Sequence, residues 1–382
     1  MKEVVQSGTH NNQLLYFTSS SLSADDQKLF FISDRTGDPN VFVKDLISGT
    51  EKCLTQNSEG YLKSYVYFDG NPYKGFGKAS VSLDAGHEII YYIQGNHICK
   101  VGVDGKITVL NDIRNGEMTA FTHVSKDGKL LCVPTTDGRA LDYDAVEPNQ
   151  TPDYDIDKRV CDEKLNSYIN VYDTETGALI LREAVNSCWI THVQFSPSDN
   201  GLILYNHEWP HDDAGTRRMW LWNSRTKAHT KLRTKENVIK PEGWACHEMY
   251  KDDGTAIIYH GRYDDDINFV GKIDTQDISK LTEIPFDKHF TKYGHFTANN
   301  DGLLVTDGYY QRDNESTPNA KYISTLSVDW EKGNIIWKEI CAHNSTWKNQ
   351  DCHPHPIFNH KGDEIYFTSD FTGKCGIYRS RS

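Results

Sequence analysis

The chain has 382 residues and a formal net charge of −13, from 41 lysines and arginines against 54 aspartates and glutamates. Aromatic residues make up 12% of it, so it has ample material for a packed core and is not a disordered chain. Such an acidic chain binds phosphate backbones poorly, which excludes nucleic acid as an expected partner. No apolar run approaches the roughly 18 residues of a membrane-spanning helix, so we expect no membrane partner either.

The N-terminal residues and the cysteines bear on location. Residues 1–8 contain no apolar signal core, so we expect a cytoplasmic protein; a periplasmic one is the alternative if a leader has been removed. The nine cysteines form no C-x-x-C pair, which favours reduced thiols over a zinc ribbon or a disulfide framework.

A repeated unit runs along the chain. Each copy has a short apolar strand, a polar turn with Asp-Gly or a similar pair, and further strands rich in β-branched and aromatic residues. In chain order, the seven copies open near residues 22, 81, 124, 195, 250, 298 and 358. No stretch with convincing helical periodicity interrupts them.

Seven units of this kind predict an all-β protein, a seven-bladed β-propeller, whose radial closure hides the sheet edges. We expect a single domain over residues 1–382, with a catalytic cleft at the axial mouth. The last copy has room for roughly three strands of a four-stranded blade, so we expect an N-terminal strand, near residues 12–17, to join it and close the ring. A pair of β-sandwiches is the alternative, but the sevenfold spacing is evidence against it.

Four histidines occupy the same register point in consecutive copies. Each lies three residues before the residue at which the turn begins; they are His192, His247, His295 and His355. Equivalent residues of propeller blades converge near the axis, so we expect the four imidazoles to meet at one mouth of the channel. Such a cluster is typical of metal binding or proton transfer. A single histidine in a blade is about as often a structural hydrogen-bond partner as a functional residue.

The segment 350–356, Gln-Asp-Cys-His-Pro-His-Pro, adds further ligand types. Residues i and i+2 of an extended segment face the same side, so His353 and His355 can share one ion. His295 would supply a third nitrogen, and Gln350 a carbonyl oxygen. Three imidazoles alone suit zinc, but an amide oxygen and waters shift the preference toward a harder, six-coordinate ion such as manganese.

Several motifs resemble the oligogalacturonate lyases, a polysaccharide lyase family built on a seven-bladed propeller. They are Gln194-Phe-Ser-Pro, residues 203–208, Arg218-Met-Trp-Leu-Trp-Asn, Cys246-His-Glu, Gly294-His-Phe, residues 350–356 and Phe367-Thr-Ser-Asp-Phe-Thr-Gly. These motifs occur in order and in matching blades. The resemblance implies an enzyme that cleaves short oligomers of galacturonate by β-elimination, with a manganese ion in the axial cleft.

The resemblance also implies roles for individual residues. The family's metal ligands, three histidines and one glutamine, fall on His295, Gln350, His353 and His355. Its catalytic base falls on His247. Its substrate-facing arginine falls on Arg218, with the adjacent Arg217 as the alternative. Further substrate contacts around the cleft are expected from His192, His207, Arg217 and Trp244.

This chemistry needs these groups because the C5 proton of a uronate is only weakly acidic. A divalent cation and an arginine disperse the charge that develops, so a neutral imidazole suffices as the base. Two other interpretations stay open: a lyase for another uronate oligomer, rhamnogalacturonan-derived or ulvan-like, and a non-enzymatic propeller whose histidines are structural. The expected partner is a small acidic oligosaccharide; its chain length and the oligomeric state of the protein do not follow from the sequence.

Overall fold

The computed structural model describes residues 1–62, 75–77, 80–140, 156–208, 218–234, 242–286, 290–292, 294–299, 302–310, 322–348 and 350–382. The chain divides into two compact units, one made of Met1–Phe17 with Leu232–Ser382 and the other of Thr18–Lys231. Both are built from short sheets, which are antiparallel except for one parallel pair of two-residue strands, and α1 (Ile156–Asp162), the one α-helix of the described residues, has only seven residues. None of the helices in the described ranges has the length and apolar character needed to cross a membrane. The single-domain organisation stays a prediction.

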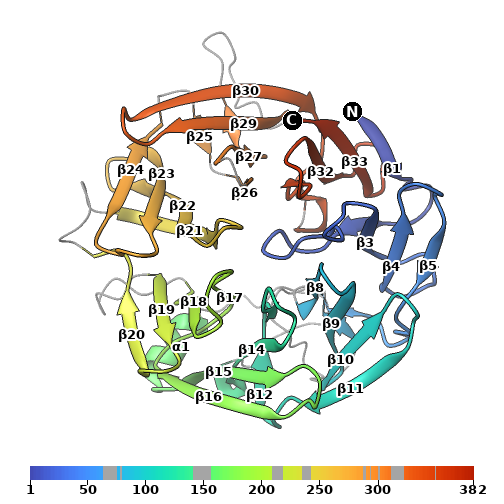
Figure 1. Ribbon diagram of the computed structural model, residues 1–382, viewed down its shortest axis with the longest axis horizontal. Coiled ribbons are helices and arrows are strands. Elements are labelled where there is room, and N and C mark those ends of the chain that lie inside the picture. Colours follow the sequence, from blue (N-terminus) through green and yellow to red (C-terminus); the bar gives the residue numbers. More distant parts are fainter. Residues whose placement is uncertain are drawn as a thin grey trace. The chain divides into compact units, whose positions relative to one another are not determined.

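The unit Thr18–Lys231 carries four sheets in chain order (Figure 1). The first includes β3 (Lys28–Ser33), β4 (Asn40–Asp45) and β5 (Glu51–Cys53). The second contains β6 (Tyr61–Leu62), β7 (Phe76–Gly77), β8 (Ser82–Asp84), β9 (Ile89–Gln94), β10 (His97–Gly102) and β11 (Ile107–Asp112). The third contains β12 (Glu117–Thr119), β13 (His123–Val124), β14 (Leu130–Asp137), β15 (Asn166–Asp173) and β16 (Leu179–Asn186). The fourth contains β17 (Val193–Phe195), β18 (Leu202–Asn206), β19 (Met219–Asn223) and β20 (Ala228–Lys231).

The other unit carries three four-stranded sheets and one two-stranded pair. The first sheet contains β21 (Glu242–Tyr250), β22 (Ala256–Tyr263), β23 (Asn268–Asp274) and β24 (Leu281–Pro285), which run side by side in Figure 1. The second contains β26 (Phe296–Ala298), β27 (Leu304–Thr306), β29 (Tyr322–Asp329) and β30 (Asn334–Ala342). The third contains β31 (Ile357–Phe358), β32 (Glu364–Ser369), β33 (Gly376–Arg381) and β1 (Lys2–Val5). The pair is β25 (Phe290–Lys292) with β28 (Tyr309–Tyr310), and β2 (Asn12–Leu14) precedes Phe17.

Four sheets in one unit and three in the other are the seven blades of a β-propeller, as predicted. The predicted turns separate the strands: β21 and β22 are joined through Gly254, and β13 and β14 through Gly128, both with φ of 72°. Only glycine adopts such a left-handed conformation freely, which is why a glycine stands in these turns.

An N-terminal strand completes the last blade, as predicted, but it is not the segment that was predicted. β1 pairs antiparallel with β33, so Lys2–Val5 completes the sheet, whereas the prediction placed this strand near residues 12–17. β2 lies outside that sheet, although the backbone N–H of Asn12 donates to the carbonyl oxygen of Cys375 at 2.8 Å. Residues 12–17 are more apolar than residues 2–5, and their apolar side chains are buried in the core, as Leu14, Leu15 and Phe17 show.

Apolar cores lie between successive sheets of this unit. Ile258 and Val270 of the β21–β24 sheet pack with Phe296 and Leu326 of the β26–β30 sheet. Val305 and Ile323 in turn pack with Ile365 and Phe367 of the last sheet. These contacts set three sheets in a fixed order, so segments at their ends are brought together.

Candidate metal centre and catalytic base

Three predicted ligands meet in the unit formed by Met1–Phe17 and Leu232–Ser382. His295 directly precedes β26, and His353 and His355 lie between the 3₁₀ turn η5 (Gln350–Cys352) and β31. One nitrogen from each ring lies within 4.8 Å of the other two, and the Nε2 atoms of His295 and His355 are 3.1 Å apart. With metal–nitrogen bonds of about 2.0–2.1 Å, neighbouring nitrogens on one ion lie about 3 Å apart, so His295 and His355 already have the spacing of two ligands of one ion.

Asp307, which follows β27, fixes two of these ligands. Its carboxylate accepts hydrogen bonds from the backbone N–H groups of His295, at 2.6 Å, and His355, at 3.1 Å. It also accepts a hydrogen bond from Nδ1 of His295 at 3.0 Å, which leaves the lone pair of that ring on Nε2. Burial raises the pKa of Asp307, but the charge and hydrogen bonds of His295 outweigh it and hold this pKa below its usual value. A buried carboxylate behind a histidine ligand is a common outer support of metal sites.

The segment that carries His355 is held in a strained conformation. His355 has φ of 45°, a conformation that costs a residue with a side chain about 1–3 kcal/mol and persists only where the surrounding contacts impose it. The hydroxyl of Thr297 donates to the carbonyl oxygen of Pro356 at 2.9 Å, and the N–H of Thr368 donates to that of Pro354 at 2.9 Å. Both flanking prolines are therefore tied to neighbouring sheets, and this aims the imidazole at His295.

His247 lies beside this group without belonging to it. It sits in a bulge of β21 with φ of 55°, and its ring packs against that of His295 with 4.7 Å between the ring centres and the planes tilted by 36°. Its Nδ1 lies 2.8 Å from Nε2 of His260 and 3.3 Å from the carbonyl oxygen of Gly294. A carbonyl oxygen only accepts, so the proton resides on Nδ1 and the lone pair on Nε2, where it can take up a proton.

Aromatic rings pack around the histidines. The ring of Trp347 lies 4.5 Å from that of His353 and is nearly parallel to that of His295 at 6.1 Å. Phe17 contacts His247 at 5.5 Å and His355 at 5.7 Å. These contacts restrict rotation of the imidazoles and shield them from water on the packed sides.

Arg218 belongs to the unit Thr18–Lys231, where it directly precedes β19 and is 6% exposed. Its guanidinium donates to Glu208 at 3.0 Å. The second carboxylate oxygen of Glu208 accepts hydrogen bonds from Asn206, at 2.6 Å, and from the hydroxyl of Thr191. Burial raises the pKa of Glu208, but the charge of Arg218 and these hydrogen bonds outweigh it and hold that pKa well below its usual value. The arginine is thus fixed by a buried ion pair.

Three residues predicted to bind substrate are half-buried. In the unit Thr18–Lys231, the ring of His192 stacks on Phe121 at 4.4 Å, and burial lowers the pKa of His207 to about 3, so that it is neutral at pH 7. In the other unit, Trp244 packs edge-on against His260 at 5.8 Å. Their contacts to substrate stay predictions.

Two further predicted residues lie outside the described part of the structure. These are Arg217 as a whole and the side chain of Gln350, of which only the backbone, at the start of η5, is described. The roles assigned to them stay predictions as well.

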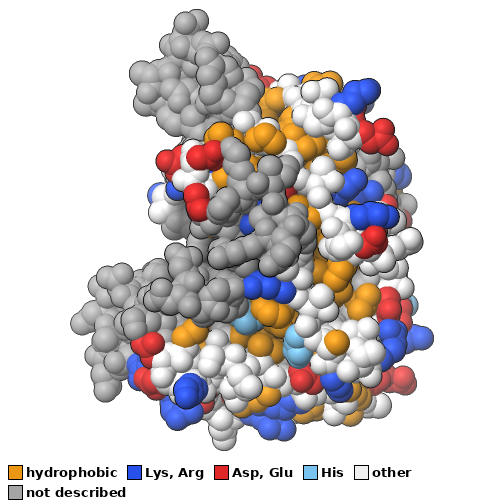
Figure 2. Space-filling view, turned by 90° about the vertical axis from the view of Figure 1, so that its left-hand side faces the viewer, with side chains coloured by type: hydrophobic (Ala, Val, Ile, Leu, Met, Phe, Trp, Pro, Cys, Tyr) orange, Lys and Arg blue, Asp and Glu red, His pale blue; other side chains and the backbone are white. Residues whose placement is uncertain are grey.

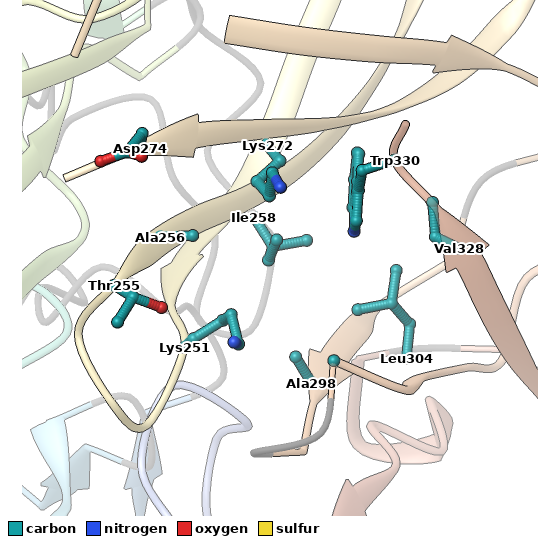
Figure 3. Close-up of a pocket in the computed structure, with 11 residues that line it drawn as sticks. Lys251, Thr255, Ala256, Ile258, Lys272, Asp274, Ala298, Leu304, Val328 and Trp330 are labelled. Carbon is teal, nitrogen blue, oxygen red and sulfur yellow. The ribbon is translucent and has the colours of Figure 1, made fainter. Parts of the chain in front are cut away.

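A separate pocket of about 280 Å³ lies between the β21–β24 and β26–β30 sheets (Figure 3). Ile258, Leu304 and Val328 form apolar parts of its wall, and the ammonium group of Lys272 lies 5.2 Å from the ring centre of Trp330. The pocket contains no residue of the histidine groups and therefore does not extend the candidate centre.

On the face drawn in Figure 2, the described basic side chains are interspersed with acidic ones.

Comparison with known proteins assigns the chain to a family. A family model described as oligogalacturonate lyase matches residues 162–381, more than half of the chain. The chain belongs to the oligogalacturonate lyase family. An oligogalacturonide lyase of Pectobacterium atrosepticum is 29% identical over 214 residues, which cover 50% of this chain and 50% of that protein. The chain thus spans about half the length of the curated relative that it matches.

Two solved structures of this family share the fold over nearly the whole chain. One is an oligogalacturonate lyase in complex with manganese, with a TM-score of 0.76, 21% identity and coverage of 99% of this chain and 92% of that one. The other, an oligogalacturonate lyase from Vibrio parahaemolyticus, has a TM-score of 0.77, 19% identity and the same coverage. The likeness confirms the predicted propeller.

Sequence analysis missed three residues of the candidate site: Asp307, His260 and Trp347. His260 was within reach, because counting back from the Asp-Gly turn of the β21–β22 hairpin places it opposite His247, and the bulge in β21 then shifts its pairing to Cys246. Asp307 was within reach in the same way, because it lies opposite His295, one step beyond the Phe296–Thr306 pair of β26 and β27. Trp347 follows no register point of the repeats, and its contacts to His353 and His295 arise from tertiary packing.

Proposed function

We propose that this protein is a manganese-dependent lyase that cleaves short oligogalacturonides by β-elimination. Membership of the oligogalacturonate lyase family supports the reaction, and the solved relative in complex with manganese supports the ion. The observation that carries the proposal is the position of His247, which lies outside the three-histidine group but has its ring 4.7 Å from that of His295. A lyase of this kind needs a cation site and, next to it, a base that is kept off the cation.

In this proposal His295, His353, His355 and Gln350 hold the ion. When bound, manganese supplies positive charge that stabilises the negative charge developing on the substrate carboxylate. Neutral imidazoles leave that charge undiminished, and four protein ligands leave positions for carboxylate oxygens and water. Asp307 keeps the proton of His295 on Nδ1 and so reserves Nε2 for the ion.

His247 is the proposed base. Gly294 and His260 hold its Nδ1 side, so its Nε2 lone pair is the one that removes the proton from C5. The C5–H electron pair then forms the C4–C5 double bond as the C4–O bond breaks, and the leaving oxygen takes up a proton. No water is consumed, so the reaction needs no pair of hydrolytic carboxylates.

Arg218 is proposed to face a substrate carboxylate, with His192, His207, Arg217 and Trp244 as further contacts. The resemblance of the Arg218-Met-Trp-Leu-Trp-Asn motif to the family supports this role. A guanidinium binds a carboxylate through two parallel hydrogen bonds, a geometry that lysine lacks. The ion pair with Glu208 fixes the direction in which the guanidinium points.

The proposal is tested by product formation. Protein reconstituted with Mn²⁺ is incubated with digalacturonate, trigalacturonate or rhamnogalacturonan-derived oligomers, and the ultraviolet absorbance of the 4,5-unsaturated uronate is followed. We expect absorbance to rise with the galacturonate oligomers. A rise with the rhamnogalacturonan oligomers alone would reassign the substrate, and no rise with any of them would favour the non-enzymatic interpretation.

A cytoplasmic location accords with the nine cysteines, all free thiols.

A further inference from the structure

A bulge in β21 turns two potential metal ligands toward the same neighbour. Consecutive side chains of a regular strand point to opposite faces. The pairing of β21 with β22 shifts between Cys246 and Met249, and His247 within this interval has φ of 55°. Cys246 and His247 therefore both approach His260, the residue that is paired with Cys246 in β22.

The distances among these three side chains suit a cation. Sγ of Cys246 lies 3.7 Å from Nε2 of His260, and Nδ1 of His247 lies 2.8 Å from that same nitrogen. One ligand atom from each of the three residues lies within 4.8 Å of the other two. In a tetrahedral zinc site, bond lengths of about 2.3 Å to sulfur and 2.0–2.1 Å to nitrogen place sulfur and nitrogen about 3.6 Å apart and two nitrogens about 3.3 Å apart. The cysteine already has this spacing, and the two imidazoles need to separate by about half an ångström.

We propose that Cys246, His247 and His260 form a second metal site, for a soft divalent cation such as Zn²⁺, beside the three-histidine centre. Thiolate is the ligand that distinguishes the two sites, because it favours Zn²⁺ over Mn²⁺, whereas the other set offers imidazole and amide oxygen. Cys246 and His260 are buried, and His247 is half-buried and forms the accessible side of the group. Three protein ligands leave a fourth position for water.

Binding at this site removes the base of the proposed lyase, a consequence that rests on the proposed function. The thiol of Cys246 releases its proton to solvent as the sulfur–metal bond forms. The cation takes the Nδ1 lone pair of His247, so the single proton of that neutral ring moves to Nε2. Nε2 then has no lone pair for the C5 proton, and the enzyme is inactive while the cation stays bound. No oxidant or reductant takes part.

Cobalt reports the proposed site directly. A thiolate ligand gives Co²⁺ an intense near-ultraviolet charge-transfer band that nitrogen and oxygen ligands do not give. We expect the chelator-stripped full chain to develop this band with one equivalent of Co²⁺ and to lose it on addition of Zn²⁺. Cys246→Ser and Cys246→Ala should abolish the band, whereas Cys53→Ser, which removes a half-buried thiol outside both groups, should retain it. Absence of the band from the wild type, or its persistence in both Cys246 variants, would overturn the proposal.

His355→Ala separates this site from the proposed lyase centre. We expect this variant to lose Mn²⁺ binding and to keep the thiolate–cobalt band, so the second site can be assessed even if the wild type shows no lyase activity. Where the lyase is active, Zn²⁺ should inhibit it in the presence of excess Mn²⁺, and Cys246→Ser should need at least tenfold more Zn²⁺ for the same fractional inhibition. Equal inhibition of wild type and variant would show that Zn²⁺ acts elsewhere and would contradict the proposed consequence.

Discussion

The Nε2 atoms of His295 and His355 face each other at 3.1 Å, although 60 residues separate them in the chain. Asp307 accepts a hydrogen bond from Nδ1 of His295, so His355 is the donor in this imidazole pair. A cation bound between the rings would take the lone pairs of both Nε2 atoms, and the proton of His355 would then reside on its Nδ1. The hydrogen bond and the cation are therefore alternatives, and the three histidines already lie together.

Metal removal should abolish activity. We expect a chelator to inactivate the enzyme, Mn²⁺ to restore it better than Mg²⁺ because imidazole ligands favour the later ion, and His353→Ala to mimic chelation. Metal content by elemental analysis and the rate of unsaturated-product formation are the measurements. Full activity in a metal-free preparation would contradict the assignment.

Replacing Asp307 should weaken metal binding without removing a ligand. Asp307→Asn keeps the shape of the side chain but no longer accepts all three hydrogen bonds, so we expect Mn²⁺ affinity to fall about 10- to 100-fold. Calorimetric titration of the metal-free protein measures this directly. Asp329→Asn, at a carboxylate that is 41% exposed in a turn, is the matched control and should bind Mn²⁺ like wild type.

The base and a ligand should respond differently to truncation. His247→Ala should lower kcat by about 10²- to 10⁴-fold, the range typical of losing a general base, and should keep its manganese. His295→Ala should lose both rate and metal, because it removes a coordinating nitrogen. If His247→Ala binds less metal than His295→Ala, the two roles are exchanged; if it keeps most of its rate, the base is another residue.

The buried pair of Arg218 and Glu208 should matter for stability as well. Glu208→Ala removes the carboxylate that neutralises the buried guanidinium of Arg218. We therefore expect the free energy of unfolding, measured in urea, to fall by about 3–5 kcal/mol. Glu364→Ala breaks a partly exposed ion pair with Arg379 and should cost less than about 1 kcal/mol. Equal losses in the two variants would show that the Glu208 pair is no stronger than a surface pair.

Burial of His207 predicts a pH dependence of stability. Its pKa is about 3 in the folded chain and ordinarily about 6.5. Between these two pH values the unfolded state binds a proton on this histidine and the folded state does not. The free energy of unfolding should therefore fall as the pH is lowered from about 6.5 toward 3, by at most about 1.4 kcal/mol per pH unit from this residue. His207→Leu should flatten this slope in urea titrations at several pH values. Parallel wild-type and variant curves would show that other groups dominate.

The repeats and their turns were predictable because they depend on local physics. Gly128 and Gly254 permit left-handed turns, and strands rich in β-branched and aromatic residues, such as β22, follow these turns. The prediction that an N-terminal strand closes the last blade is confirmed, but its predicted position is wrong, because strand pairing at a sheet edge depends on backbone hydrogen bonds more than on apolar sequence. Lys2–Val5, the polar alternative, makes those hydrogen bonds with β33.

The sequence by itself determined the blade pattern, the family motifs and the histidines that a common register brings together. Only the tertiary structure decided how those histidines differ, because their partners and backbone conformations differ from blade to blade. Asp307 fixes His295 and His355, whereas in a bulge of β21 the Nδ1 side of His247 faces His260 while its ring packs beside His295. The physical reason is that a repeating pattern specifies which residues lie at equivalent points, while side-chain direction follows from local backbone strain and from packing between sheets.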